Sequence, residues 1–194
     1  MNAKKIPEKK IKKTRAKKTS FFSRAKNEVF SRTVISVQRK KIIWFAVKFF
    51  AIFFALHAII VSAELTLLNQ LIAGISASSL GLMHSGNMIL TGSGVFFITN
   101  SCTGLVSASI LAATIFSLKK PGIKAKFAIF FTGLIIIFLA NIPRIMLVLA
   151  AAQTGLDAEL VHTLTWFIMS AIVLIVWYYG TKKIAGIKEF NSLL

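Results

Sequence analysis

Four long apolar runs divide this sequence, and each comes near the length of a membrane-spanning helix. They cover residues 42–63, 103–118, 127–152 and 161–179. A helix needs about 20 apolar residues to cross the hydrocarbon core of a bilayer, or somewhat fewer at the shortest. Of all residues, 56% are hydrophobic and 15% are charged, which is far too apolar for an ordinary soluble domain. The sequence therefore predicts an all-α integral membrane protein with about four transmembrane helices.

The basic residues outside these runs lie in alternate connections. Residues 1–41 hold 15 of the 24 Lys and Arg, the connection "KKPGIKAK" after the second run holds four, and the segment after the fourth run holds three. The connections 64–101 and 153–160 hold none. Because short loops rich in Lys and Arg stay in the cytoplasm, we expect both termini to be cytoplasmic. The connection between the first and second helices is then an extracytoplasmic segment of a multi-pass plasma-membrane protein.

Most of the formal net charge of +18 belongs to the N-terminal segment. A Lys-rich segment cannot bury enough apolar area to fold alone, so we expect residues 1–41 to be disordered or to lie on anionic headgroups. A nucleic-acid partner is not expected, because the tail lacks interleaved aromatic residues and any nucleic-acid-binding motif. A transmembrane domain over residues 42–181 and a short cytoplasmic tail over residues 182–194 complete the predicted organisation.

Three reactive side chains fall on the predicted extracytoplasmic side of the membrane. Cys102 is the only cysteine and begins the second run, Arg144 lies 17 residues beyond Phe127, and His162 is the second residue of the fourth run. At about 1.5 Å per helical residue, all three reach a similar depth. Each has a simpler interpretation, as a small buried thiol, a snorkelling guanidinium or a structural imidazole. Their agreement in depth and side favours one shared site.

The chemistry of these three groups is complementary. A thiol is mostly protonated near neutral pH, so a nucleophilic cysteine needs a cationic neighbour or a base. Arg144 can stabilise a thiolate or the oxyanion of a tetrahedral intermediate without losing its proton. His162 can exchange a proton with the thiol or with a leaving amine. The trio is therefore suited to nucleophilic catalysis by Cys102.

Four further residues are expected to support the trio. Gly104 lets a backbone approach closely, and Asn100 flanks the cysteine on its N-terminal side. Pro143 removes one backbone donor and is expected to kink the third helix, while Asn141 satisfies a freed carbonyl or orients Arg144. The alternative is that Pro143 is a packing kink and Asn141 an ordinary interhelical contact.

The connection 64–101 is predicted to hold an interfacial helix to about Leu80, followed by extended segments broken by glycines. This region is a plausible substrate cleft. Its His84 is a second candidate for the acid/base role. His57 in the first helix is a third, with Glu64 seven residues later on the same helical face. A structural role is the commoner fate of such histidines.

In combination, the candidate residues resemble the exosortase and archaeosortase family of membrane transpeptidases over roughly residues 42–180. The residues that carry this resemblance are, in order, Cys102 with Gly104, an NxxR pattern from Asn141 to Arg144, and His162 at the start of the last helix. The resemblance implies that Cys102 forms a thioester, that Arg144 stabilises charge and that His162 is the acid/base partner. The chain departs from the family by its long basic tail and by having only four clear spans.

The same resemblance implies the substrates. These are exported proteins with a C-terminal sorting signal made of a short motif, an apolar helix and a basic cluster. The new C-terminus is transferred to an acceptor, for which membrane lipid is one candidate. The sequence contains no paired Cys and His at metal spacing, no Walker loop and no dinucleotide fingerprint, so neither a metal nor a cofactor is expected.

A second class of function stays open at this point. The chain could be a non-enzymatic membrane scaffold or transport subunit, with the basic tail as its anchor to lipid or to a partner. Only the enzyme needs Cys102 as a thiolate, so this residue separates the two hypotheses.

Overall fold

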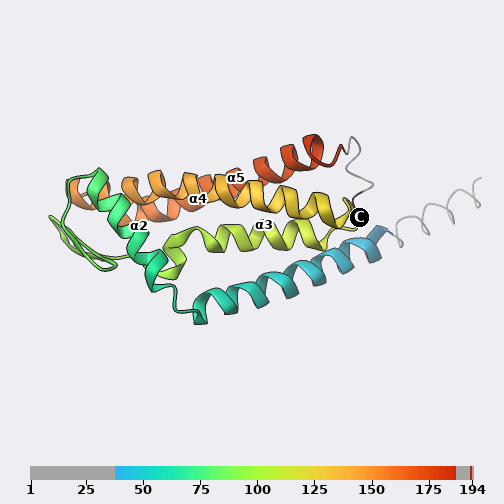
Figure 1. Ribbon diagram of the computed structural model, residues 1–194, viewed down its shortest axis with the longest axis horizontal. Coiled ribbons are helices and arrows are strands. Elements are labelled where there is room, and N and C mark those ends of the chain that lie inside the picture. The colour runs from blue at the N-terminus through green and yellow to red at the C-terminus, as the bar shows by residue number, and fades with distance from the viewer. Residues whose placement is uncertain (1–37, 187–192, 194) are drawn as a thin grey trace, which may run out of the picture. The chain divides into compact units, whose positions relative to one another are not determined.

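The computed structural model describes residues 38–186 and residue 193. The chain divides into two units, Met1–Trp44 and Phe45–Leu194, and the fold described below is that of the second. Nearly all of the predicted basic tail lies outside the described residues, as does much of the predicted C-terminal tail. After the first helix, the elements follow in this order (Figure 1): α2 (Thr66–Ser79), β1 (His84–Ser85), β2 (Met88–Thr91), β3 (Gly94–Phe97), the 3₁₀ helix η1 (Asn100–Thr103), α3 (Leu105–Ser117), α4 (Ile123–Thr154) and α5 (Ala158–Lys183).

Three helices in the described part of the chain are long and apolar enough to cross a membrane. They are Gln38–Ser62, α4 and α5. The protein is thus a membrane protein with several candidate spans, and three of the four predicted runs are confirmed as helices of spanning length. The helix predicted at residues 103–118 is different, because α3 has only 13 residues.

The shortness of α3 has a local cause at each end. Gly104 precedes the helix in the left-handed conformation, with φ 82°, and Leu118 follows it with an extended backbone. A 13-residue helix is about 20 Å long, whereas the hydrocarbon core is about 30 Å thick. The prediction of four spans is therefore corrected to three helices of spanning length and one short apolar helix among the described residues.

Helices α3, α4 and α5 pack against one another around an apolar core. Its buried members are Leu111, Ile115, Ile129, Ile137, Met169, Val173 and Val176. Two glycines let the helices approach closely. A Cβ atom on Gly133 would lie 2.7 Å from Val176 Cγ1, and one on Gly180 would lie 2.6 Å from Ile129 Cγ2. Small residues are typical of such transmembrane interfaces, and here they bring α4 against α5.

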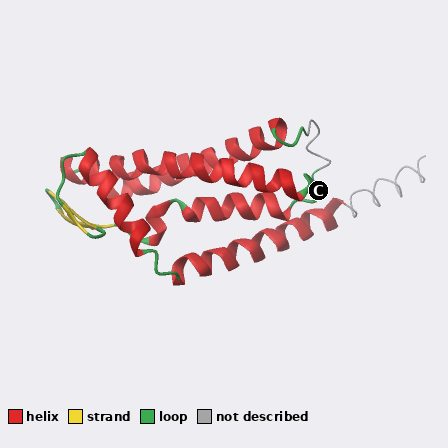
Figure 2. Ribbon diagram, in the orientation of Figure 1, coloured by secondary structure: helices red, strands yellow, loops and turns green. Residues whose placement is uncertain are grey.

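The segment between the first helix and α3 adds a small sheet to the helices (Figure 2). Strands β1, β2 and β3 form a three-stranded antiparallel sheet in that order, with Ile89 opposite Phe96 and Leu90 opposite Val95. The expected helix to about Leu80 followed by extended segments is confirmed. The prediction of an all-α fold is corrected to a mostly helical one. Glycines with positive φ at the turns, such as Gly86, allow the chain to reverse between short strands.

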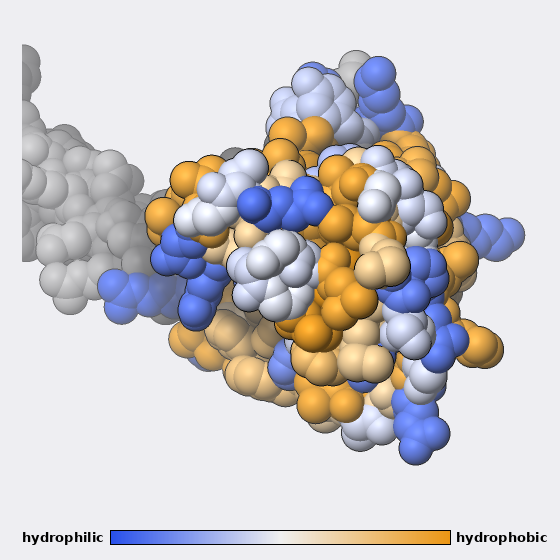
Figure 3. Space-filling model, turned by 90° about the vertical axis from the view of Figure 1, so that its left-hand side faces the viewer, coloured by the Kyte–Doolittle hydropathy of each residue, from blue (hydrophilic) through white to orange (hydrophobic). Residues whose placement is uncertain are grey.

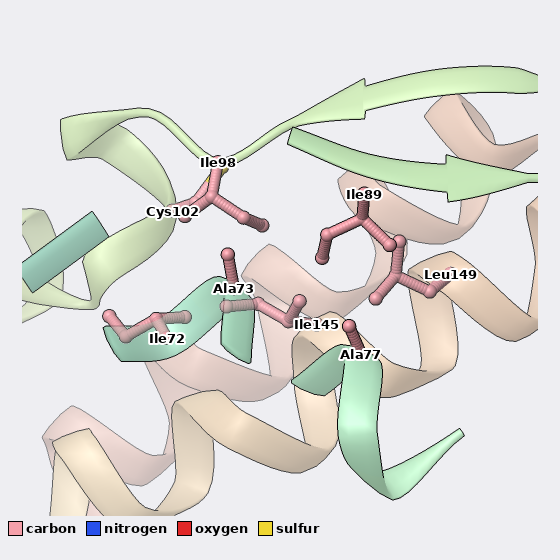
Figure 4. Packing of buried hydrophobic residues seen from close by; sticks show 8 residues of the cluster. All are labelled: Ile72, Ala73, Ala77, Ile89, Ile98, Cys102, Ile145 and Leu149. Carbon is pink, nitrogen blue, oxygen red and sulfur yellow. The ribbon is translucent and has the colours of Figure 1, made fainter. Parts of the chain in front are cut away.

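A second apolar cluster joins this sheet to the helices (Figure 4). It contains Ile72, Ala73 and Ala77 of α2, Ile89 of β2, Ile98, Cys102, and Ile145 and Leu149 of α4. The cysteine thus packs in the same cluster as the turn of α4 that directly follows Arg144. Burial of this cluster fixes the cysteine segment on α4, since about 25 cal/mol is gained for each Å² of apolar surface removed from water.

Candidate active site

The guanidinium of Arg144 contacts several side chains in this part of the protein. Arg144 lies on α4 and is only 5% exposed. Its Nε donates to Thr165 Oγ1 at 3.2 Å, and its Nη1 donates to Asn141 Oδ1 at 3.2 Å. Its Nη2 lies 3.4 Å from Nδ1 and 3.3 Å from Nε2 of His162. All three guanidinium nitrogens therefore have a partner, and the orientation of the cation is determined.

Trp166 covers this cation and also holds the histidine. The Arg144 Cζ atom lies 4.7 Å from the centroid of the indole ring, within the range of a cation–π interaction. The indole Nε1 donates to His162 Nε2 at 3.1 Å. Because an indole N–H can only donate, His162 Nε2 is the acceptor and the neutral imidazole carries its proton on Nδ1. One tryptophan thus orients both the guanidinium and the imidazole.

The start of α5 positions His162. Asp157 caps the helix, since its Oδ1 accepts from the backbone N–H groups of Glu159 at 2.9 Å and Leu160 at 3.1 Å. Thr165 and Trp166 follow His162 by three and four residues, so all three lie on one helical face. Thr165 Oγ1 also donates to the carbonyl of His162 at 2.8 Å. The helix therefore presents the imidazole together with its two contacts to Arg144.

Cys102 lies on the 3₁₀ helix η1, before α3 rather than in its first turn. It is 8% exposed, and its N–H donates to Thr99 O at 2.8 Å. The Thr99 hydroxyl lies 3.6 Å from Cys102 Sγ. A tight turn of this kind ends at Gly104, whose φ of 82° disfavours any side chain. A Cβ atom at Gly104 would also lie 3.2 Å from Asn141 Cβ, so glycine allows α4 to approach the cysteine turn.

Asn141 connects the cysteine turn to the arginine. Its Nδ2 donates to the carbonyl of Cys102 at 2.6 Å, and its Oδ1 accepts from Arg144. Asn141 is 1% exposed, so both bonds are made in a dry environment. Asn141 therefore contacts Arg144, and its other bond is to a carbonyl outside α4 rather than to one beside Pro143.

Asn100 ties the cysteine turn to the preceding helices. Its Nδ2 donates to the carbonyls of Ile60 at 2.8 Å and Ala63 at 2.9 Å, at the end of the first helix. Its Oδ1 accepts from Asn69 of α2 at 2.8 Å. The bond to Ile60 satisfies a carbonyl in the last turn of the first helix, where carbonyls lack an intrahelical partner, while the Ala63 carbonyl also accepts from Leu65 N–H at 3.1 Å. Asn100 therefore anchors η1, and Cys102 with it, to two other elements.

The remaining candidates lie apart from this network. Helix α4 runs through Pro143, which lies next to Arg144 and is exposed on the surface. The ring of His57 stacks on Phe53, with centroids 5.6 Å apart. His84 is exposed and lies over α2, with its Cε1 3.5 Å from the Cβ position of Gly74. The contacts of the described residues connect neither histidine with Arg144 or His162.

Three contributors to the site were not identified from the sequence. Thr165 and Trp166 could have been found from their helical spacing to His162, which places them on the same face. Thr99 carries no such signal, because its contact with the thiol depends on the 3₁₀ turn. In the described part of the chain, no three His, Cys, Asp or Glu side chains group as metal ligands would.

Comparison with known proteins gives one match. The family model described as transmembrane exosortase matches residues 31–178, which include every residue of the network above. No curated protein and no solved structure matches the chain.

Proposed function

The chain belongs to the transmembrane exosortase family, and on that premise we propose that it is a cysteine transpeptidase that processes C-terminal sorting signals. Membership of this family implies a sorting transpeptidase role. The finer proposal is that Cys102 is the nucleophile, that Arg144 stabilises negative charge and that His162 transfers protons. The substrates are exported proteins that end in a short motif, an apolar helix and a basic cluster.

The observation that carries this proposal is the bridge made by Asn141. This side chain bonds the backbone of Cys102 on one side and the guanidinium of Arg144 on the other, and Arg144 in turn contacts His162. Three groups that are far apart in the sequence thus belong to one connected, largely buried network. The bond from Asn141 goes to the backbone carbonyl of Cys102, while the thiol contacts the Thr99 hydroxyl. A scaffold or transport subunit would have no need to hold a buried arginine beside the cysteine turn.

The proposed reaction has two steps. In the first, the thiol proton passes to His162 and the thiolate attacks the scissile carbonyl carbon, so that a C–S bond forms and the carbonyl oxygen becomes an oxyanion beside Arg144. Collapse breaks the C–N bond, and the leaving amine takes the proton from His162. In the second step, an acceptor nucleophile gives its proton to His162 as it attacks the thioester, the C–S bond breaks, and the Cys102 thiolate takes the proton back from His162. Proton uptake at His162 Nε2 displaces both donors that lie beside it, the indole N–H of Trp166 and the Nη2 group of Arg144.

The test is processing of a reporter by the full-length protein in membranes. The reporter carries a C-terminal signal of the proposed kind, encoded in the same genome. We expect a shorter reporter on a gel, and we expect added hydroxylamine to intercept the thioester as a C-terminal hydroxamate of the reporter, detected by mass spectrometry. Cleavage that never yields a hydroxamate or a thioester on Cys102 would contradict the transpeptidase mechanism.

The proposal also places the site on the extracytoplasmic side, because the basic connections lie at the other ends of the helices. In a Cys102→Ala background, a cysteine at Ser85 is expected to react with a membrane-impermeant thiol reagent on intact cells. A cysteine at Lys120 is expected to react only after the membrane is opened. Both positions are exposed, so accessibility of the side chain does not differ between them. The opposite labelling pattern would invert the topology.

A further inference from the structure

Strand β3 is the open edge of the three-stranded sheet. The strand order is β1-β2-β3, so β3 pairs with β2 on one side and has no strand on the other. Edge strands present unpaired backbone groups that can pair with another extended chain. The sheet lies at the end of the molecule seen in Figure 3, where hydrophobic and hydrophilic residues mix at the surface.

The register determines which backbone groups of β3 face the open edge. Ile98 N donates to Asn87 O at 2.9 Å, so these two residues form a hydrogen-bonded pair. Hydrogen-bonded and non-bonded pairs alternate in an antiparallel ladder, which makes Ile89 and Phe96 the next bonded pair. The N–H and C=O groups of Val95 and Phe97 therefore point away from β2. No other backbone partner for these groups occurs within the described residues.

The side chains of β3 differ between the two faces of the sheet. Phe96 packs against the core cluster together with the fully buried Ile89. On the opposite face of the sheet, Val95 is 50% exposed and Phe97 is 55% exposed. Their cross-strand neighbours Leu90 and Met88 are exposed as well. The open edge therefore offers free backbone groups and the exposed side chains of Val95 and Phe97 to an added strand, whereas Leu90 and Met88 lie one strand farther in.

This edge leads directly into the cysteine turn. Phe97 ends β3, and Cys102 follows five residues later. The turn folds back through the bond from Cys102 N–H to Thr99 O, and Ile98 and Cys102 lie in the same cluster (Figure 4). At about 3.3 Å per extended residue, the five-residue connection limits the distance from Phe97 to Cys102 to what an extended peptide of about five residues can span.

We propose that the sorting signal docks by adding a strand to the open edge of β3, with its extended segment beside Val95 and Phe97 and its scissile bond at Cys102. This inference rests on the proposed function and adds the means of substrate recognition. The occupant is an extended peptide, because the edge carries main-chain donors and acceptors and ends at the candidate nucleophile. Main-chain pairing supplies affinity, and the alternate side chains supply specificity.

The first test is Val95→Pro in the full-length protein with the reporter described above. Proline removes the outward N–H of Val95, and no bond to β2 is lost, because that N–H faces the open edge. Loss of this one hydrogen bond predicts up to about tenfold slower processing. The rate at which a small alkylating reagent modifies Cys102 is expected to stay within about twofold of wild type, which shows that the site is intact.

Leu90→Thr is the matched control. Leu90 faces the same side of the sheet as Val95, but its N–H bonds to Met83 O at 2.9 Å and not to the open edge. This variant removes apolar surface from the face and leaves the edge unchanged, so processing is expected to stay near wild type. An equal loss in Leu90→Thr would show that the face contacts lipid, and the strand-addition proposal would be wrong.

A cross-linking experiment keeps the proposal testable if Val95→Pro disturbs the sheet. Phe97→Cys is combined with Cys102→Ala, and single cysteines are placed in turn along the reporter before its scissile bond. A paired strand in one register predicts a disulfide chiefly at the reporter position directly opposite Phe97→Cys, and none at the two adjacent positions, whose side chains lie on the other face. Equal disulfide formation at consecutive positions, or no disulfide at all, overturns strand addition. A wild-type protein that does not process the reporter would instead count against the proposed function itself.

Discussion

Replacement of Cys102 by alanine is expected to abolish reporter processing, with a loss of at least about 1,000-fold. The thiolate would form the covalent intermediate, and an alanine side chain has no atom that can replace it. The structural cost is small, because the change removes one sulfur atom from a side chain that is 8% exposed. The measurement is the gel mobility of the reporter, together with the hydroxylamine product, at matched levels of membrane-inserted protein.

Cys102→Ser provides a second, chemically closer variant. A serine hydroxyl is far harder to ionise beside Arg144 than a thiol, so nearly the same loss is expected. Ser101→Ala is the matched control, since this neighbour lies on the same 3₁₀ turn but is exposed. Normal processing by stably inserted Cys102→Ala protein would disprove the cysteine mechanism and leave the scaffold hypothesis as the better account.

Arg144→Lys is expected to lower processing by about 100-fold to 1,000-fold, which is typical for loss of a charge-stabilising donor. The guanidinium uses three nitrogens at once, toward Thr165, Asn141 and His162. An ammonium group keeps the charge but cannot reproduce this planar arrangement, and it loses the stacked contact with Trp166. We therefore expect the lysine to be wrongly placed rather than wrongly charged. The measurement is the rate of thioester formation in a single turnover.

Two comparisons separate this defect from a general loss of folding. Arg39→Lys makes the same chemical change at an exposed position of the first helix and is expected to leave processing unchanged. The amount of Arg144→Lys protein in the membrane is measured in parallel, because a buried cation with poor contacts is costly. A stable Arg144→Lys protein with wild-type rates would show that charge alone suffices, and the orienting role of Asn141 and Thr165 would lose its support.

The candidate trio was predictable because its chemistry is rare in such a sequence. A lone thiol, an arginine within a long apolar run and a histidine at the start of another run can each be recognised without coordinates. Because basic and non-basic connections alternate along the chain, Cys102, Arg144 and His162 were predicted to lie on the same side of the membrane. Membership of the exosortase family, which the match over residues 31–178 shows, agrees with the resemblance recognised from Cys102, the NxxR pattern and His162.

The limits of sequence reasoning appear most clearly at residues 84–118. Hydropathy treats 103–118 as a span, because it registers apolar content and not the backbone conformation of Gly104. Gly104, in the left-handed conformation, follows the 3₁₀ helix η1 and precedes α3. Cys102 therefore lies on η1 and not in α3. Short strands such as β2 and β3 are also hard to predict, since pairing between them depends on contacts across the sheet.

The sequence by itself determined the membrane character of the chain and the positions of its long helices, and it supplied the candidates for its reactive groups. These properties follow from local composition and from the alternation of charge, which do not depend on how the helices pack.

Only the tertiary structure decided which side chains meet. The bridge through Asn141 and the contact of Trp166 with Arg144 join elements that are distant in the chain, and the open edge of β3 depends on the register of the sheet. Such contacts arise from helix packing and sheet register, and these depend on the combined burial of many residues rather than on any single motif.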